Sequence, residues 1–246
     1  MSVERLAELL REHQPCVVLT GAGVSTESGI PDFRSPTGIW RRYDPMEYAT
    51  IAAFLADPEK VWGFYGKRLA SLADVEPNVG HRALADLEQR GWVDAIVTQN
   101  VDGLHERAGS RTVVEVHGSI RTSSCLECGT AVPFAEALAR LPVPACATCG
   151  RVLKPDVVMF GELLPQAAMD RAVRLASEAG LLLVVGSSLE VYPVAGLPLE
   201  TLAAGGKLAI VNRGETQFDV DAAVCIDAGA GETLSALAEA LPDRLQ

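Results

Sequence analysis

The chain has 246 residues, of which 48% are hydrophobic, enough for one large folded domain with a smaller module attached. Its 21 Lys and Arg residues against 32 Asp and Glu residues give a formal net charge of -11, which repels nucleic-acid phosphates and anionic membranes. The charged N-terminus lacks a signal peptide and no apolar run can span a bilayer, so we expect a cytoplasmic protein without direct nucleic-acid or membrane partners.

Amphipathic helices alternate with short apolar strands along most of the chain. Helical spacing covers residues 3–12, 58–72, 79–89, 165–178, 193–204 and 232–240, and Asn78 is the expected N-cap of the third helix. Apolar strands, each followed by a polar or glycine-containing loop, cover residues 16–20, 95–98, 113–116, 181–185 and 208–211. This alternation predicts an α/β fold with a Rossmann-like, doubly wound parallel sheet, in which ligands bind where strands end.

Two stretches interrupt the alternation. Residues 118–153 carry four cysteines and three prolines, and we interpret them as a small zinc-ribbon-like domain. This domain is inserted into a larger one made of residues 1–117 and 154–246. Residues 29–48 are rich in proline and show no clear period, which predicts a mobile loop over a site. We also expect a small helical or lid insertion at about residues 35–75, which overlaps this loop in part.

The first strand leads into Gly21-Ala22-Gly23-Val24-Ser25. The two glycines let backbone N–H groups approach a phosphate, and Ser25 adds a hydroxyl. This loop favours dinucleotide binding, although the full G-x-G-x-x-G spacing is absent and no acidic residue follows a second strand. An ordinary tight turn is the alternative.

A second loop, from Thr98 to His105, follows a buried strand and therefore faces the same crevice as the glycine loop. Asn100 can hydrogen-bond a ribose hydroxyl or a water, and Asp102 can accept from a carboxamide N–H such as that of nicotinamide. Alternatively, both side chains cap the following helix.

One of the four histidines, His117, lies at the end of the strand 113–116 with Gly118 beside it. This placement suits a general base. An isolated histidine is more often a structural residue, so the assignment depends on the other motifs.

Four of the six cysteines form two Cys-x-x-Cys pairs, Cys125/Cys128 and Cys146/Cys149. Four thiolates at this spacing make a closed tetrahedral zinc site, so the metal would be structural and not catalytic. A redox role is disfavoured because neither pair lies in a strand-to-helix turn.

The last two loops of the crevice follow the strands 181–185 and 208–211. They contain Gly186, Ser187, Ser188 and Asn212, whose hydroxyl and amide groups suit the ribose and phosphates of an adenosine nucleotide. The same residues are also common in ordinary loops.

Read in order, GAGVSTESGIPDFRS, TQNVDGLH, VHG, the four cysteines, KPDVVMFGELLP, GSSLEVYP and IVN resemble the sirtuins of bacteria and archaea, which are NAD-dependent protein-lysine deacylases. The resemblance extends from Leu19 to the last helix. It implies a Rossmann-like domain that binds NAD as a consumed co-substrate, a small domain with one structural Zn²⁺, and an acyl-lysine protein or peptide bound between them. The implied products are free lysine, nicotinamide and O-acyl-ADP-ribose.

The resemblance also implies residue roles. The residues implied to contact NAD are Gly21, Ala22, Gly23, Ser25, Thr26, Asp32, Phe33, Arg34, Gln99, Asn100, Val101, Asp102, His117, Gly186, Ser187, Ser188, Asn212 and Ala228. The peptide would add as a strand along Val158, Phe160, Gly161, Glu162, Glu190, Val191 and Tyr192. His117 and Asn100 would be catalytic: the acyl oxygen attacks the nicotinamide ribose, and His117 then activates a ribose hydroxyl while Phe33 shields the centre.

Tyr65 and Arg68 share one face of the helix 58–72, and Ala49 precedes them. This combination resembles the sirtuin branch that removes succinyl and malonyl groups, in which Tyr and Arg bind the acyl carboxylate and a small residue leaves room. Asp32 departs from that branch, which usually carries Thr there. We hypothesise activity on acidic acyl-lysines, with deacetylation also possible.

Two other classes of function remain open. A dehydrogenase would also bind NAD on this fold, but it requires the complete glycine fingerprint. A non-catalytic NAD or ADP-ribose reader with a zinc interaction module fits the fold equally well, but it has no use for a base such as His117. We expect a monomer.

Overall fold

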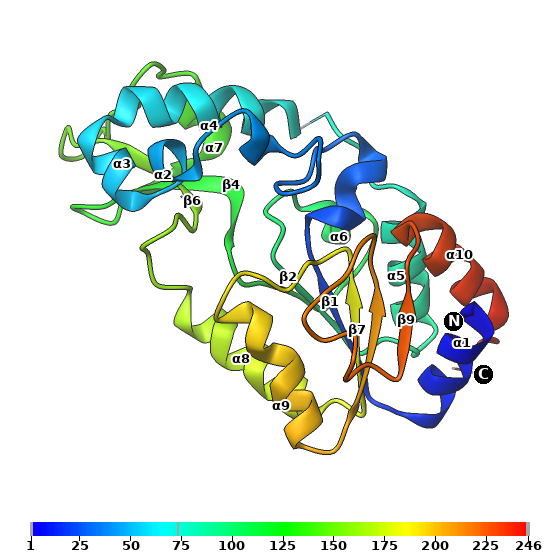
Figure 1. Ribbon diagram of the computed structural model, residues 1–246. Coiled ribbons are helices and arrows are strands. Elements are labelled where there is room, and N and C mark those ends of the chain that lie inside the picture. Colours follow the sequence, from blue (N-terminus) through cyan, green and yellow to red (C-terminus); the bar gives the residue numbers. More distant parts are fainter. Residues whose placement is uncertain (1, 73, 245–246) are drawn as a thin grey trace.

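The computed structural model describes residues 2–72 and 74–244. Its larger part is a six-stranded parallel sheet in the order β3-β2-β1-β7-β8-β9 (Figure 1). The strands are Val113–Glu115 (β3), Ala95–Thr98 (β2), Cys16–Thr20 (β1), Leu181–Val185 (β7), Lys207–Val211 (β8) and Val224–Ile226 (β9). Counted along the chain within this sheet, the order is the 3-2-1-4-5-6 of a Rossmann fold, so the predicted fold class is confirmed.

Helices cover both faces of the large sheet. One face packs against α1 (Val3–Glu12), α5 (Val79–Gln89) and α10 (Ala230–Ala240), and the other against α8 (Gln166–Glu178) and α9 (Leu197–Ala203) (Figure 1). Because neither face meets water, all five residues of β1 and all five of β7 are buried. Burial on both faces is the reason that these strands have continuous apolar sequences.

Most helix boundaries follow from local chemistry. The side chain of Asn78 accepts hydrogen bonds from the backbone of Gly80 and His81, so it caps α5 as predicted. The predicted helix 193–204 is divided into a 3₁₀ turn and α9, which has Pro198 in its first turn. The helix expected after Asp102 is α6 (Leu104–Arg107), whereas the strand β9 of the large sheet was not predicted. Among the described residues, no helix is both long and apolar enough to cross a membrane.

The loops that follow β1 and β7 are in direct backbone contact. The amide of Gly23 donates to the carbonyl of Gly186 over 2.8 Å, and the amide of Gly21 donates to that of Val185 over 3.1 Å. A Cβ on Gly23 would lie 2.7 Å from the Cα of Gly186, so no side chain fits there. This contact lies at the switch point of the sheet, where the strand order reverses and a crevice opens.

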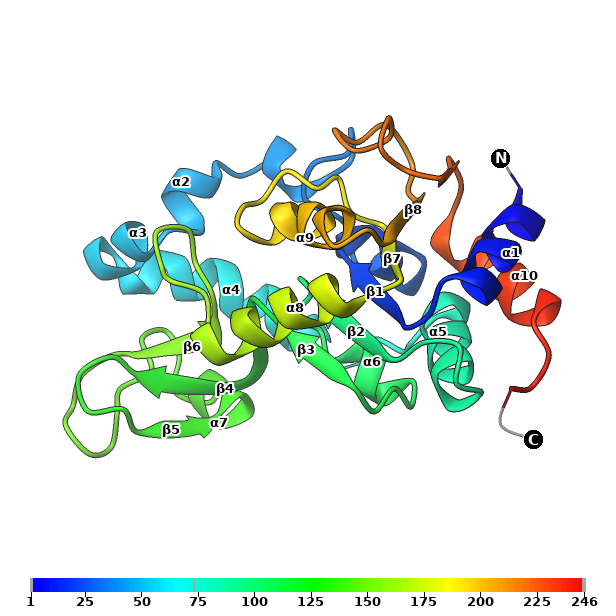
Figure 2. The ribbon, with the colours of Figure 1, turned by 90° about the horizontal axis from the view of Figure 1, so that it is seen from below.

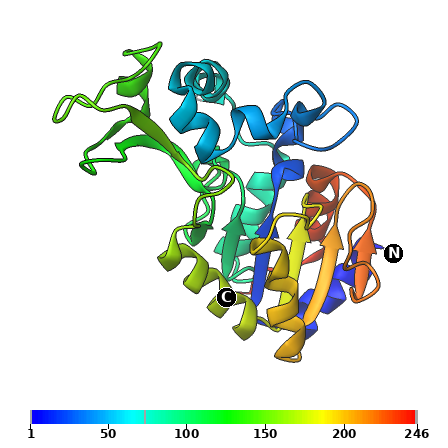
Figure 3. The same ribbon diagram turned by 60° about the vertical axis from the view of Figure 1, so that its left-hand side comes forward.

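The smaller part of the molecule is a lobe beside the carboxyl ends of the large sheet (Figures 2 and 3). It contains the antiparallel strands β4 (Gly118–Cys125), β5 (Ala131–Pro133) and β6 (Leu153–Val157), with α7 (Phe134–Leu138). The helices α2 (Pro45–Tyr48), α3 (Ile51–Ala56) and α4 (Pro58–Leu72) lie beside these strands. Trp62 of α4 is fully buried, stacks on Phe134 and donates to the carbonyl of Leu153 over 2.8 Å.

The segment of residues 29–48, which was predicted to be a mobile loop, contains defined structure. Residues 29–48 include the 3₁₀ turn η2 (Ile39–Arg41) as well as α2, and their backbone is tied by hydrogen bonds from Ile39 and Trp40 to Asp32 and Phe33. The division into domains at residues 117/118 and 153/154 stays a prediction. The small sheet itself extends beyond residue 153, because β6 ends at Val157.

The close contact between Gly23 and Gly186 has a measurable consequence. Gly186 has φ +61°, and an added Cβ would lie 2.4 Å from the backbone nitrogen of Val24. We therefore expect Gly186→Ala to lower the free energy of unfolding by about 2 to 5 kcal/mol, since strain and overlap both contribute. Gly205→Ala is the control, because Gly205 has φ +86° but no atom within 4 Å of the added Cβ. It should cost about 1 kcal/mol. Equal losses in urea unfolding would contradict the importance of the contact.

Candidate functional site

A cavity of about 1280 Å³ lies along the carboxyl ends of the large sheet and is closed on the far side by α4 and the small lobe. Every residue implied to contact NAD lines it, and so do all the residues implied to contact the peptide and the acyl group except Ala49. Ala49 is buried, and its carbonyl accepts a hydrogen bond from Phe160 over 2.8 Å. Its predicted role of leaving room for an acyl group stays a prediction.

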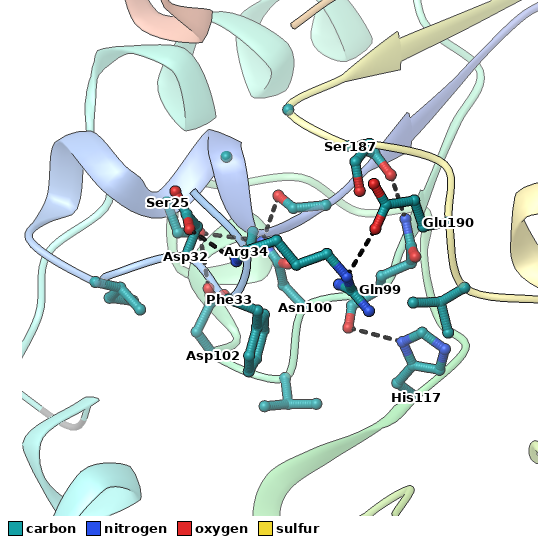
Figure 4. A pocket seen from close by; sticks show the side chains of 18 of the residues that line it. Ser25, Asp32, Phe33, Arg34, Gln99, Asn100, Asp102, His117, Ser187 and Glu190 are labelled. Atoms are coloured by element: carbon teal, nitrogen blue, oxygen red, sulfur yellow. Dashed lines mark hydrogen bonds and ion pairs between the residues drawn. The ribbon is translucent and has the colours of Figure 1, made fainter. Parts of the chain in front are cut away.

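A buried network of polar side chains forms the floor of the cavity (Figure 4). The hydroxyl of Ser25 donates to Asp102 over 2.8 Å, and the side-chain amide of Asn100 donates to Ser25 and to the carbonyl of Gly21, both over 3.1 Å. The second carboxylate oxygen of Asp102 accepts a hydrogen bond from the backbone of Leu104, the first residue of α6, although the N-cap position itself is Gly103. Burial raises the pKa of Asp102.

His117 lies at the hinge between the two parts of the molecule, after β3 and before β4. Its Nδ1 is 3.1 Å from the carbonyl oxygen of Gln99. Because a carbonyl only accepts hydrogen bonds, Nδ1 must carry the proton, and Nε2 of the neutral ring keeps its lone pair. Burial lowers the pKa of His117, so the ring is neutral at neutral pH.

The loop of residues 29–43, which we call the lid, contributes residues 29–37 and Trp40 to the wall of the cavity. Asp32 stabilises its turn by accepting hydrogen bonds from the backbone of Arg34 and Ser35. The ring of Phe33 packs 5.3 Å from that of Trp40, measured between centroids. Arg34 extends to the opposite wall, where its Nε lies 2.9 Å from a carboxylate oxygen of Glu190 (Figure 4).

Tyr65 and Arg68 of α4 line the cavity together, as their spacing predicted. Burial raises the pKa of Tyr65 to about 12 and lowers that of Arg68 to about 10, so at neutral pH the phenol is neutral and the guanidinium is charged. Among the described residues Arg68 has no carboxylate partner, and its guanidinium carbon lies 4.8 Å from the centroid of Phe33. In the described part of the chain, Arg68 is thus a half-buried cation that stacks on an aromatic ring and forms no ion pair.

The segment after β6 is held firmly by its neighbours. The backbone of Phe160 pairs with Ala49 and Ile51, and the amide of Val158 donates to the carbonyl of His117 over 2.9 Å. Lys154 is buried below it, with Nζ 3.0 Å from the carboxylate of Glu162. On the opposite side of the cavity, Val191 and Tyr192 follow Glu190.

The remaining residues implied to contact NAD occupy the other loops at the sheet edge. Gln99 bridges two of these loops by donating to Ser187 over 2.9 Å. Asn212 uses its side-chain amide to hold its own loop, with bonds to the carbonyls of Arg213 and Gly214. Val101, Gly161, Ser188, Thr26, Ala22 and Ala228 line the cavity.

Two histidines below the cavity were not identified from the sequence. His105 is fully buried, with Nε2 2.9 Å from the hydroxyl of Thr20, and its ring lies 4.9 Å from that of His81. Nε2 of His81 lies 3.4 Å from the hydroxyl of Ser25. Burial lowers the pKa of His105 to about 3 and of His81 to about 4, so both rings are neutral. Neither residue stands at the end of a strand, so no sequence pattern singled them out.

The four predicted metal ligands come together in the small lobe. The Sγ atoms of Cys125, Cys128, Cys146 and Cys149 all lie within 4.8 Å of one another. The closest pairs are 3.4 and 3.6 Å apart, close to the spacing of about 3.8 Å expected for four sulfurs around tetrahedral zinc. Each Cys-x-x-Cys pair, Cys125/Cys128 and Cys146/Cys149, lies in a tight turn that ends in a glycine. These residues fit a structural zinc ion.

Comparisons with known proteins agree with this geometry. Residues 21–193 match the model of the Sir2 family. The chain is 47% identical over 241 residues to the "NAD-dependent protein deacylase 2" of Pyrobaculum aerophilum, covering 98% of this chain and 96% of the relative. A solved Sir2 complex with a p53 peptide and NAD+ is 40% identical, with a TM-score of 0.91 over 97% of this chain and 98% of that one. A complex with a deacetylated p53 peptide and 3'-O-acetyl ADP ribose is 41% identical, with a TM-score of 0.94 and the same coverage.

If the four cysteines hold a structural zinc ion, a substitution that removes one of them should lower both the zinc content and the thermal stability of the protein. Cys146→Ser should reduce bound zinc well below one ion per chain and lower the melting temperature by roughly 10 °C or more, because structural zinc contributes directly to folding. Cys225→Ser is the control, since Cys225 lies outside the cluster. Metal analysis and thermal melts check this, and normal stability of a zinc-free protein would contradict a structural role.

Proposed function

The chain belongs to the Sir2 family, and we infer from this that it removes acyl groups from protein lysines with NAD as co-substrate. The products are free lysine, nicotinamide and O-acyl-ADP-ribose. The similar solved chains with NAD+ and with 3'-O-acetyl ADP ribose support this reaction. NAD would supply a glycosidic bond that is activated because nicotinamide leaves as a neutral molecule, and its cleavage drives acyl transfer. The residues of the cavity would bind and orient the two substrates and accept a proton from a ribose hydroxyl.

We propose that His117 is the general base, and this is the assignment that carries the mechanism. The carbonyl of Gln99 fixes the Nδ1–H tautomer, so Nε2 is free to accept a proton. Burial keeps the ring neutral at neutral pH, which is the form that a base needs. His117 would accept the proton of a ribose hydroxyl and so make its oxygen nucleophilic.

Asn100 is the second proposed catalytic residue. Its side-chain N–H groups are held by Gly21 and Ser25, which orients its amide oxygen. A fixed amide oxygen can accept a hydrogen bond from a ribose hydroxyl or from a water molecule. We propose that it orients the ribose beside His117, while Ser25 and Asp102 fix Asn100 from below.

The glycine loop and the lid complete the proposed NAD site. The backbone N–H groups near Gly21 and Gly23 suit the pyrophosphate, and Ser187, Ser188 and Asn212 suit the adenosine ribose. The lid brings Phe33 and Arg34 to the same cavity. We propose that the lid excludes water while the glycosidic bond breaks.

For the acyl group we propose a preference for acidic chains, with acetyl also accepted. The supporting observation is Arg68, which is charged and half-buried and lacks a carboxylate partner among the described residues. The neutral hydroxyl of Tyr65 lines the same cavity. A guanidinium with a neighbouring phenol can bind a carboxylate through several charge-assisted hydrogen bonds.

The two alternative functions fit less well. A non-catalytic reader has no use for a neutral histidine held in one tautomer beside the ribose. A dehydrogenase needs an acidic ribose partner after its second strand, where this chain has Gln99 and Asn100. We propose a cytoplasmic monomer. None of the six cysteines forms a disulfide, which suits a reducing compartment.

The pH profile tests the role of His117. Since its pKa is lowered by burial, kcat/KM for deacylation should be level at neutral pH and fall only below the ordinary histidine value of 6.5, as the ring becomes protonated. His117→Ala should reduce kcat by about a hundredfold to ten-thousandfold. An acidic limb centred above 6.5, or an active His117→Ala variant, would count against this role.

Arg68 tests the acyl preference. Arg68→Met should lower kcat/KM for a succinyl-lysine peptide by about tenfold to a hundredfold, because charge-assisted hydrogen bonds are lost. The value for the matching acetyl peptide should change much less. Tyr65→Phe removes only a hydroxyl and should show the same trend more weakly. Equal losses on both peptides would exclude a carboxylate-binding role.

A further inference from the structure

In the part of the chain that the structure describes, one ion pair joins the lid to the opposite wall of the cavity. Arg34 Nε lies 2.9 Å from Glu190 Oε2, and the two side chains are 37% and 58% exposed (Figure 4). Arg34 belongs to the lid, next to Phe33, whereas Glu190 belongs to the loop after β7. Among the described residues, Glu190 forms no other ion pair.

Arg34 is also one of the few cations available to a nucleotide in this cavity. The positively charged side chains that line it are those of Arg34, Arg68 and Arg213. Arg68 lies on α4 and stacks on Phe33, and the guanidinium of Arg213 lies beside Gly229. Arg34 extends from the lid to Glu190, and we take it as the cation that the pyrophosphate would meet (Figure 4).

The carboxylate of Glu190 and the pyrophosphate of NAD would compete for the side chain of Arg34. Both anions seek the same planar guanidinium, and each gains from charge-assisted hydrogen bonds to it. If both stayed close to Arg34, the negative charge of Glu190 would also repel the doubly charged pyrophosphate. NAD binding must therefore displace Glu190 or tolerate it at a cost in affinity.

We propose that Glu190 is an intramolecular competitor of NAD: it holds Arg34 while the site lacks a nucleotide, and the pyrophosphate displaces it. This inference rests on the proposed function, because it takes the cavity as the NAD site. Glu190 stands on the segment proposed to receive the peptide, and Arg34 stands on the lid. The ion pair thus connects the lid to the peptide-binding loop and lowers the affinity for NAD.

The test uses ADP-ribose, which carries the pyrophosphate but no cleavable nicotinamide. Isothermal titration of the full chain with ADP-ribose should show that Glu190→Gln lowers Kd by about twofold to fivefold, the range expected for an exposed ion pair. The glutamine keeps the size and exposure of the side chain, so the fold should persist. Asp170→Asn is the matched control, because Asp170 lines the same cavity and loses the same charge, but forms no ion pair among the described residues. Its Kd should stay unchanged.

A double-mutant cycle separates the ion pair from general electrostatics. In an Arg34→Met background, Glu190→Gln should no longer tighten ADP-ribose binding. The proposal is overturned if Glu190→Gln leaves Kd unchanged or raises it, if Asp170→Asn tightens binding equally, or if the gain persists without Arg34. Failure of the wild-type chain to bind ADP-ribose would instead refute the proposed NAD site, and with it this inference.

Discussion

The backbone contact between the loops after β1 and β7 is the constraint on which the rest of the structure depends. Gly23 and Gly186 approach so closely that neither can carry a Cβ, and two hydrogen bonds hold the loops together. After β1 the sheet continues through β2 and β3 in one direction, and after β7 it continues through β8 and β9 in the other. The carboxyl ends of the strands therefore leave a crevice at this point. The lid begins directly after the glycine loop, and the cavity lies between them.

Beneath this contact, burial gives the site its chemistry. His117, His105 and His81 are all neutral because they are removed from water, and Asp102 is fixed by Ser25 and Leu104. Polar groups that are already oriented need little rearrangement when charge develops in a reaction, and this is the usual source of catalytic power in enclosed sites. The cations Arg34 and Arg68 line the same cavity.

Much of the fold could be predicted from the sequence because two-sided burial leaves a strong pattern. The run at 181–185 and the capped helix starting after Asn78 are local signals, and both were found. β9 is three residues long and contains the half-buried Cys225, so its hydrophobic pattern was too weak for the strand to be predicted from the sequence. The four cysteines and the strand-end residues Asn100 and His117 could also be identified from the sequence, because their spacing and their positions after strands are local patterns. The partners of Arg34 and Arg68 were not, because Glu190 and Phe33 are distant in the chain and meet them only in the folded molecule.

The central claim is that NAD is bound here to be cleaved as lysine is deacylated. The most direct measurement is mass spectrometry of all products after incubating the protein with NAD and succinyl-lysine or acetyl-lysine peptides. The account predicts equal amounts of free-lysine peptide, nicotinamide and O-acyl-ADP-ribose from at least one of the peptides. Intact NAD with an unchanged peptide, or reduced nicotinamide in place of free nicotinamide, would contradict it.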